Sequence, residues 1–180
     1  MDHAGIVLAG GAARRLSGVD KPALPVGGKP LLARALAALA DADPVIVVGP
    51  VRPGFDDVVW TREAEPGTGP VAALAAGLAL VPTEIVVVLA GDLAGVRSST
   101  VDRLVGSLGA ASGAVLVDGS GERQWLLGAW RVEALREALP EAVENASLRR
   151  TLGGLEIVEV PEEPGESDDI DTPEDLDRWS

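Results

Sequence analysis

Short apolar runs alternate along this chain with segments of helical spacing, and this alternation restricts its fold more than any other feature. The clearest run is Glu84–Ala90, which is β-branched and uninterrupted, as expected for a strand buried on both faces. Similar runs predict further strands at Gly5–Ala9, Pro44–Gly49, Asp57–Thr61, Gly113–Asp118, Gln124–Trp130 and Leu155–Val160.

The segments between most of these runs predict helices. Proline opens two of them, at Pro30 and Pro70, where a missing backbone N–H is tolerated. Others are predicted from Ser98, Val132, Ser147 and Thr172. Strands that alternate with helices predict a three-layer α/β/α, Rossmann-like fold with a mostly parallel sheet and right-handed crossovers. With 180 residues and 47% hydrophobic content, we expect a single domain over residues 1–180.

Composition narrows the function. The net charge of −13 disfavours binding to nucleic acids and to anionic membranes. The chain has no cysteine, and His3 is its single histidine, which disfavours thiol chemistry and histidine-based hydrolysis. Any metal site must therefore use oxygen ligands, which favours Mg²⁺, with Mn²⁺ as an alternative. Without a leader-like or membrane-spanning run, we expect a cytoplasmic protein.

The first candidate site follows the first predicted strand. Paired glycines, Gly10 and Gly11, allow backbone N–H groups to approach a phosphate closely. Arg15 offers a fork of donors and Lys21 a point charge, with Asp20 as a candidate partner for Lys21. The alternative is a solvated glycine-rich turn with incidental charges. Neither a Walker A loop nor a dinucleotide-binding fingerprint is present here.

Acidic residues form the second candidate site. Asp92 directly follows the strongest predicted strand, and the carboxyl ends of parallel strands share one edge of a sheet, so Asp92 and Lys21 can meet in one crevice. We favour a metal ligand over a helix cap for Asp92, because Ser98–Thr100 already offers caps. Two interpretations of Asp169 and Asp171 stay open: they belong to this site, or they help to start the helix at Thr172.

Several weaker signals have structural alternatives. Gly67–Ala72 matches G-x-G-x-x-A but follows no strand, so a loop is favoured over a dinucleotide site. Arg149 and Arg150 are either a solvated basic face or a grip on an acceptor phosphate. The tryptophans are expected in the core or at an interface, with Trp125 as the one that merits a test as a ligand contact.

The motif order resembles a known family. The segment L-A-G-G-x-x-x-R-x-x-G-x-D-K at Leu8–Lys21 is similar to the opening of the molybdenum cofactor guanylyltransferase family, within the NTP-transferase superfamily. Later segments resemble this family in the same order and extend over nearly the whole chain: Gly28–Leu31, Gly69–Leu74, Leu89–Asp92, Gln124–Arg131, Ser147–Arg149 and Asp169–Leu176.

The resemblance implies a nucleotide-diphospho-sugar-transferase-like sheet and a set of roles. Arg15, Lys21 and Asp92 would be catalytic, and Asp92 and Asp171 would bind Mg²⁺. The nucleotide would lie against Leu8, Ala9, Gly10, Gly11, Gly18, Lys21, Gly49, Gly69 and Asp92. GTP and molybdopterin would be the substrates and pyrophosphate the second product. Transient contact with other cofactor-assembly proteins is also expected.

Departures from the family pattern keep alternatives open. Gly49 stands where an asparagine that helps to read guanine is expected, and Trp125 occupies the proline position of Q-P-L. Gly11, in contrast, favours guanine over cytosine. The first hypothesis is therefore GMP transfer to molybdopterin. The second is transfer from CTP or to another small phosphorylated acceptor, and the third is a nucleotide-binding module without catalysis.

Overall fold

The computed structural model describes residues 2–10, 15–16 and 19–179, with the backbone alone at 15, 16 and 19. Its centre is a seven-stranded sheet in the order β11-β9-β10-β8-β1-β6-β7. The strands are β1 (His3–Leu8), β6 (Val45–Val48), β7 (Val59–Thr61), β8 (Ile85–Ala90), β9 (Gly113–Val117), β10 (Arg123–Arg131) and β11 (Ile157–Pro161). Among these described strands β10 alone runs antiparallel, so the predicted mostly parallel sheet is confirmed.

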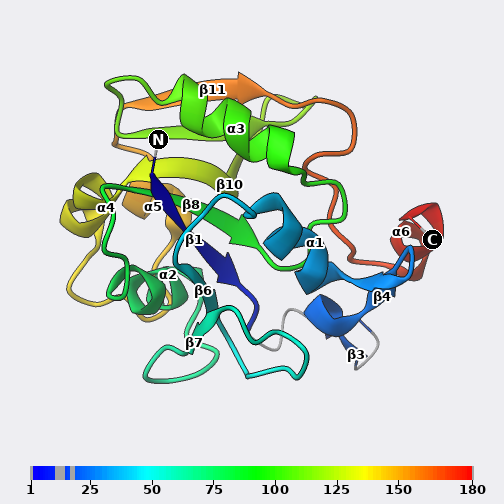
Figure 1. Ribbon diagram of the computed structural model, residues 1–180. Coiled ribbons are helices and arrows are strands. Elements are labelled where there is room, and N and C mark those ends of the chain that lie inside the picture. Colours follow the sequence, from blue (N-terminus) through cyan, green and yellow to red (C-terminus); the bar gives the residue numbers. More distant parts are fainter. Residues whose placement is uncertain (1, 11–14, 17–18, 180) are drawn as a thin grey trace.

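Helices cover both faces of the sheet (Figure 1). One face carries α1 (Leu31–Ala38) and α3 (Ser98–Ser107), and the other carries α2 (Pro70–Leu78), α4 (Val132–Ala138) and α5 (Leu148–Leu152). Every residue of β1 and β8 is buried, because alternate side chains face the two helical layers. Val87 and Leu89 pack on the α1/α3 side, for example, whereas Val86 and Val88 pack on the α2/α4 side. The three-layer prediction is therefore confirmed.

The charged and glycine-rich stretch between β1 and α1 has short elements of its own. Two-residue strands form two hairpins, β2 (Arg15–Leu16) with β3 (Val19–Asp20) and β4 (Pro25–Val26) with β5 (Lys29–Pro30). The 3-10 turn η2 (Lys21–Ala23) lies between the hairpins. The sequence predicted a long connection here without regular elements. Gly11 and Gly18 lie outside the described residues.

The C-terminal segment returns to the carboxyl end of β8. Ala94 N donates to Asp168 O at 2.9 Å, and Ile170 N donates to Asp92 O at 3.3 Å. The helix α6 (Pro173–Trp179) then packs near β4, where Ile170 and Trp179 contact a small apolar cluster (Figure 1). Residues from the end of the chain are thus fixed beside the residues that follow β8.

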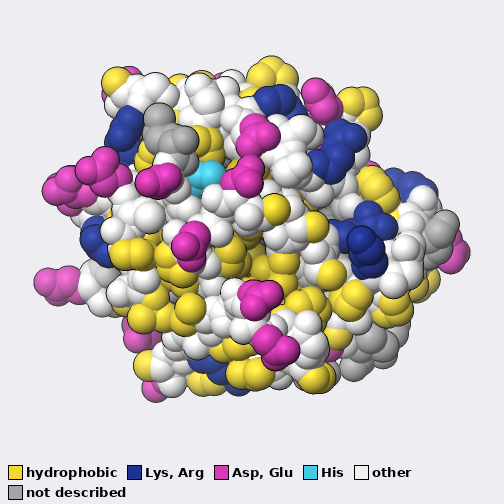
Figure 2. Space-filling model, in the orientation of Figure 1, with side chains coloured by type: hydrophobic (Ala, Val, Ile, Leu, Met, Phe, Trp, Pro, Cys, Tyr) yellow, Lys and Arg dark blue, Asp and Glu magenta, His cyan; other side chains and the backbone are white. Residues whose placement is uncertain are grey.

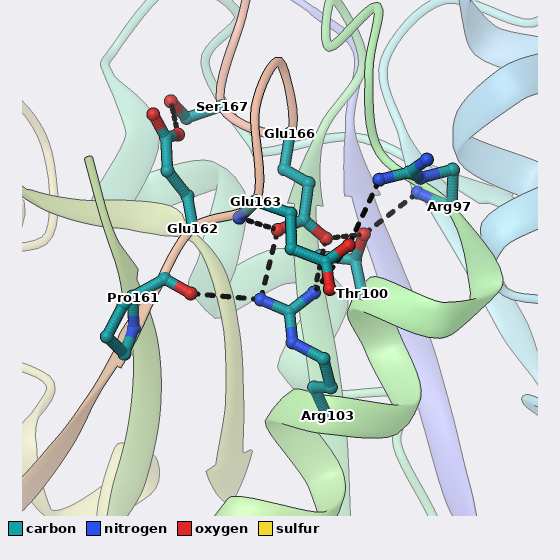
Figure 3. Close-up of polar contacts among 8 residues, drawn as sticks. All are labelled: Arg97, Thr100, Arg103, Pro161, Glu162, Glu163, Glu166 and Ser167. Carbon is teal, nitrogen blue, oxygen red and sulfur yellow. Dashed lines mark hydrogen bonds and ion pairs between the residues drawn. The ribbon is translucent and has the colours of Figure 1, made fainter. Parts of the chain in front are cut away.

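A buried carboxylate anchors this return (Figure 3). Glu166 is 0% exposed and accepts two bonds from Arg103, at 2.6 and 3.0 Å, together with bonds from the Thr100 hydroxyl and from Glu163 N. Burial opposes ionisation, but these donors outweigh it and hold the pKa of Glu166 below its ordinary value. Arg103 also donates to Pro161 O, which ties the end of β11 to α3.

The surface agrees with the acidic composition. On the face in Figure 2 the acidic side chains are scattered among apolar and polar ones instead of gathering in one patch. In the described part of the chain, no helix combines the length and the apolar character that crossing a membrane requires.

Candidate active site

Lys21 is a buried cation held by two carboxylates. It begins η2 directly after β3, and it is only 3% exposed. Its Nζ donates to Asp171 Oδ1 at 2.8 Å and to Asp92 Oδ2 at 3.2 Å. Burial alone would lower the pKa of Lys21, but the two carboxylates outweigh it and raise this pKa above its ordinary value. Lys21 is therefore charged at neutral pH.

Three carboxylates meet around this ammonium. Asp92 follows the end of β8, and Asp169 and Asp171 come from the returning C-terminal segment. One oxygen from each lies within 4.8 Å of the others. Burial, together with the charges of Asp171 and Asp92, raises the pKa of Asp169 to about 6. Clustered carboxylate oxygens with excess negative charge are the donor set that a hard divalent cation prefers.

A cavity of about 400 Å³ opens onto this cluster. Its wall combines Lys21 and the three aspartates with apolar groups from the ends of β8 and β10 and with several polar side chains. The lining residues are Lys21, Ala90, Asp92, Leu93, Arg123, Gln124, Trp125, Leu126, Leu127, Ser167, Asp169 and Asp171. The volume is within the range of small-molecule sites, and its position beyond the carboxyl ends of strands is typical of ligand sites on parallel sheets.

An arginine from the loop after β6 joins the two ends of the glycine-rich loop. Arg52 is 8% exposed, and it contacts both oxygens of Asp20, at 2.6 and 2.7 Å. It also donates to Ala9 O at 2.7 Å. Ala9 starts the glycine-rich loop and Asp20 ends it, so one guanidinium spans the loop and fixes the position from which Lys21 projects.

The backbone at the start of this loop is closely packed. Ala9 N donates to Val48 O at 2.8 Å, and Gly91 N donates to Leu8 O at 2.9 Å. A Cβ at Gly49 would lie 2.6 Å from Ala9 O, so a side chain there would force the backbone to shift. Glycine at position 49 is thus explained by the close approach of two chain segments.

The structure brings together part of the predicted site. Lys21 and Asp92 meet at one point, as the shared edge of the sheet predicts, and Asp171, which the sequence left open, joins them there. Leu8, Ala9, Gly10 and Gly49 lie at the neighbouring ends of β1 and β6. Gly69 precedes α2 and packs near Asn145. The backbone of Arg15 pairs with Asp20, and the side chain of Arg15 lies outside the described residues.

The structure contradicts the prediction for Asp20 and decides between the two interpretations of Asp171. Asp20 does not hold Lys21, because its carboxylate pairs with Arg52. Asp171 is not a helix cap through its carboxylate: that group contacts Lys21, while Thr172 and Asp175 exchange the capping bonds of α6. No pattern in the sequence indicated Arg52, Arg123 or Ser167, because their positions depend on contacts between distant segments.

Comparisons with known proteins show the family of this chain. Residues 5–160 match the family described as the MobA-like NTP transferase domain. The chain is 32% identical to a molybdenum cofactor guanylyltransferase of Rhodobacter capsulatus over 99% of this chain and 95% of that protein. It is also 32% identical to one from Mesorhizobium japonicum, over 86% of this chain and 79% of that protein.

Solved structures share the fold. A molybdopterin-guanine dinucleotide biosynthesis protein A from Archaeoglobus fulgidus matches with a TM-score of 0.74 and 21% identity, over 97% of this chain and 95% of that chain. A 2-C-methyl-D-erythritol 4-phosphate cytidylyltransferase from Thermus thermophilus matches with a TM-score of 0.75 and 23% identity, over 99% and 97%. Fold and site thus define a nucleotidyltransferase. The chain belongs to the MobA-like NTP transferase family, and the predicted resemblance is confirmed.

Proposed function

We propose that this chain transfers GMP from GTP to the phosphate of molybdopterin, which forms the guanine dinucleotide and releases pyrophosphate. Family membership supports nucleotidyl transfer, and the names of the relatives support these two substrates. The observation that carries the proposal is the meeting of Lys21, Asp92 and Asp171 beside one cavity. We also propose that residues 1–180 act as one domain, because the C-terminal segment beyond the family match supplies Asp169 and Asp171.

The reaction is an in-line substitution at phosphorus. An oxygen of the acceptor phosphate forms a bond to the α-phosphorus of GTP, and the bond from that phosphorus to the α,β-bridging oxygen breaks. Pyrophosphate leaves with the electron pair. The acceptor phosphate is already ionised, so no strong base is required, and the protein mainly has to position two anions and compensate their charge.

The cations of the loop meet this requirement. Lys21 keeps its proton, since its pKa is raised, and its ammonium is available to phosphate oxygens next to the carboxylates. The backbone of Arg15 pairs with that of Asp20, the residue before Lys21, and we assign Arg15 to the same triphosphate. We assign the backbone of Gly10 to the nucleotide as well, because it starts the glycine-rich loop beyond the carboxyl end of β1, where Ala9 and Leu8 are hydrogen-bonded to neighbouring segments.

Asp92, Asp169 and Asp171 would hold Mg²⁺, or Mn²⁺ in its place. The donor set fits a hard divalent cation, because each residue offers a carboxylate oxygen. The pKa of Asp169 is raised first by burial and then by the negative charges of Asp171 and Asp92. When bound, such a cation would supply compensation for the charge on the phosphates. We expect Asp92 and Asp171 to be the essential ligands.

A matrix of nucleotides and acceptors tests the proposal. Pyrophosphate release should require Mg²⁺, GTP and molybdopterin together, and the Asp92→Asn variant should lose it. The closely packed Gly49 has no side-chain amide that could bind guanine, so CTP is the second candidate donor. Release with CTP but not GTP would replace the donor in this proposal. No release with molybdopterin and any nucleotide would overturn the proposal.

A further inference from the structure

A second cavity adjoins the first. It has a volume of about 460 Å³, and its lining residues are Gly121, Glu122, Arg123, Trp125, Arg149 and Glu159. Arg123 and Trp125 also line the cavity that contains Lys21 and Asp92. These two residues therefore line both cavities, and a ligand that occupied both cavities would contact them.

An irregularity in the sheet presents Trp125 at this wall. Strand β10 pairs with β9 at Gln124 and Leu116, and the next pair is Gly128 with Val115. Residues 125–127 are therefore extra residues on β10, and such bulges redirect side chains, often next to active sites. The hairpin beside the bulge is held by Asp118, which accepts bonds from Gln124 and from two backbone N–H groups of the turn.

The half-buried Trp125 ring is held from one side by a fixed cation. The Arg123 guanidinium lies 5.7 Å from the ring centre, a cation–π contact. Glu159 binds the same guanidinium at 2.8 Å and compensates its charge. A ring that is already ordered loses little freedom when a planar ligand stacks on it, so this arrangement suits an aromatic contact.

Arg149 supplies a cation that is still available. It projects from the short helix α5, is exposed, and lines the second cavity. Within the part of the chain that the structure describes, its guanidinium forms no ion pair or hydrogen bond, whereas Arg123 is paired with Glu159. A guanidinium and an aromatic ring that line the same cavity favour a ligand with both a planar ring and an electron-rich edge.

We propose that the second cavity binds the ring system of the acceptor: a planar, conjugated heterocycle stacks on Trp125, its polar edge faces Arg149, and its phosphate points past Arg123 toward Lys21. This inference rests on the proposed function and specifies which part of the molecule determines acceptor choice. A pterin phosphate has this chemistry. Neither a sugar phosphate nor a phospholactate contains a planar, conjugated heterocycle, so neither would stack on Trp125 in this way.

Substitutions at Trp125 separate stacking from packing. Trp125→Leu keeps apolar volume but removes the aromatic face, and Trp125→Phe keeps a smaller aromatic face. We expect Trp125→Leu to raise the KM for molybdopterin about tenfold to a hundredfold, the scale of a lost stacked ring, and Trp125→Phe to restore most of the loss. The KM for GTP should change little in both. Because Trp125 also packs against the core on the α2/α4 side, both substitutions should lower the melting temperature to a similar extent. Equal effects of Leu and Phe would overturn the stacking role.

Arg149 has a matched control in its neighbour. Arg150 is on the same short helix and is exposed, but it does not line the cavity. Arg149→Gln should raise the KM for molybdopterin about tenfold, and Arg150→Gln should leave it unchanged. A similar effect of both substitutions would indicate only the general charge of the surface and would overturn the assignment of Arg149.

A binding measurement distinguishes this inference from the proposed function. Titration calorimetry with 6-hydroxymethylpterin, which has the ring but no phosphate, should give binding to the native protein and to Trp125→Phe but not to Trp125→Leu. This result without any transfer to molybdopterin would support the ring site and reject the proposed acceptor. Transfer to molybdopterin with an unchanged KM in Trp125→Leu would support the proposed acceptor and reject the ring site. Absence of pterin binding to the native protein would overturn the ring site.

Discussion

The ammonium of Lys21 lies 2.8 Å from the Asp171 carboxylate, although 150 residues separate them in the sequence. The contact joins the loop after the first strand to the segment that returns from the last strand. Because Lys21 sits among the same carboxylates that could hold a metal, the ammonium and a divalent cation compensate the same negative charge. Removing either one should make the protein depend more on the other.

Lys21→Met tests this coupling. Without the ammonium, Asp92 and Asp171 repel each other with less compensation, so the metal-free variant should be less stable. Saturating Mg²⁺ should then raise its melting temperature more than that of the native protein, because a cation that binds only the folded state stabilises it. Lys29→Met, at an exposed position outside the cavity, is the control. An equal Mg²⁺ response in all three proteins would contradict the shared site.

Asp171→Asn should weaken the binding of Mg²⁺ and so raise the Mg²⁺ concentration that the reaction needs. The substitution removes a charge that both Lys21 and a cation use, so the Mg²⁺ concentration for half-maximal activity should rise about tenfold or more. Asp177→Asn, on the exposed side of α6, provides the comparison. Mg²⁺ titrations of pyrophosphate release measure the effect. An unchanged midpoint in Asp171→Asn would remove this residue from the metal site.

Arg52→Lys should loosen the glycine-rich loop while keeping the charge. Lysine cannot form the forked contact with Asp20 and reach Ala9 O at the same time, so we expect a higher KM for GTP and a loss of about 1–3 kcal/mol in unfolding free energy. A double-mutant cycle with Asp20→Asn should give a coupling energy of about 1 kcal/mol or more. The half-exposed Arg62 offers a matched Arg62→Lys control. Additive effects at positions 20 and 52 would argue against the contact.

These residues also show how far the sequence could predict the site. Lys21 and Asp92 could be brought together from the sequence because Asp92 and the loop that carries Lys21 follow parallel strands, whose carboxyl ends share an edge. Asp20 was given the wrong partner because adjacent residues in an extended segment point to opposite sides. The contacts of Arg52 and the position of the bulge at Trp125 depend on backbone segments that are distant in the sequence. A local sequence pattern cannot predict such contacts.

Glu166 should make stability depend on pH in the acid range. Its folded-state pKa is below the ordinary value, so its ionised form adds stability above the unfolded-state pKa, and this contribution is lost as the pH falls through the folded-state pKa. Glu166→Gln should therefore destabilise the protein by about 3 kcal/mol at pH 7, because Arg103 loses its buried partner and keeps only the exposed carboxylate of Glu163, at 3.8 Å.

The difference between Glu166→Gln and the native protein should shrink as the pH falls below the ordinary pKa of a glutamate and then through the lowered folded-state pKa of Glu166, because the carboxylate that Arg103 binds becomes protonated. Denaturant unfolding at several pH values measures it. Glu141→Gln, at an exposed position, should show no such trend. A difference that stays constant with pH would mean that ionisation of Glu166 is not what anchors the C-terminal segment to α3.

Gly49→Asn tests whether the missing asparagine can simply be restored. A Cβ at this position would lie 2.6 Å from Ala9 O and 3.0 Å from Gly10 N, both backbone atoms that cannot move without shifting the start of the loop. We expect a destabilisation of about 1–3 kcal/mol and a higher KM for GTP, because the strain acts on the nucleotide loop itself. Gly119→Asn is the control, since a Cβ there meets nothing within 4 Å. A lower KM for GTP without loss of stability would mean that the backbone yields easily and that an amide at position 49 helps to bind guanine.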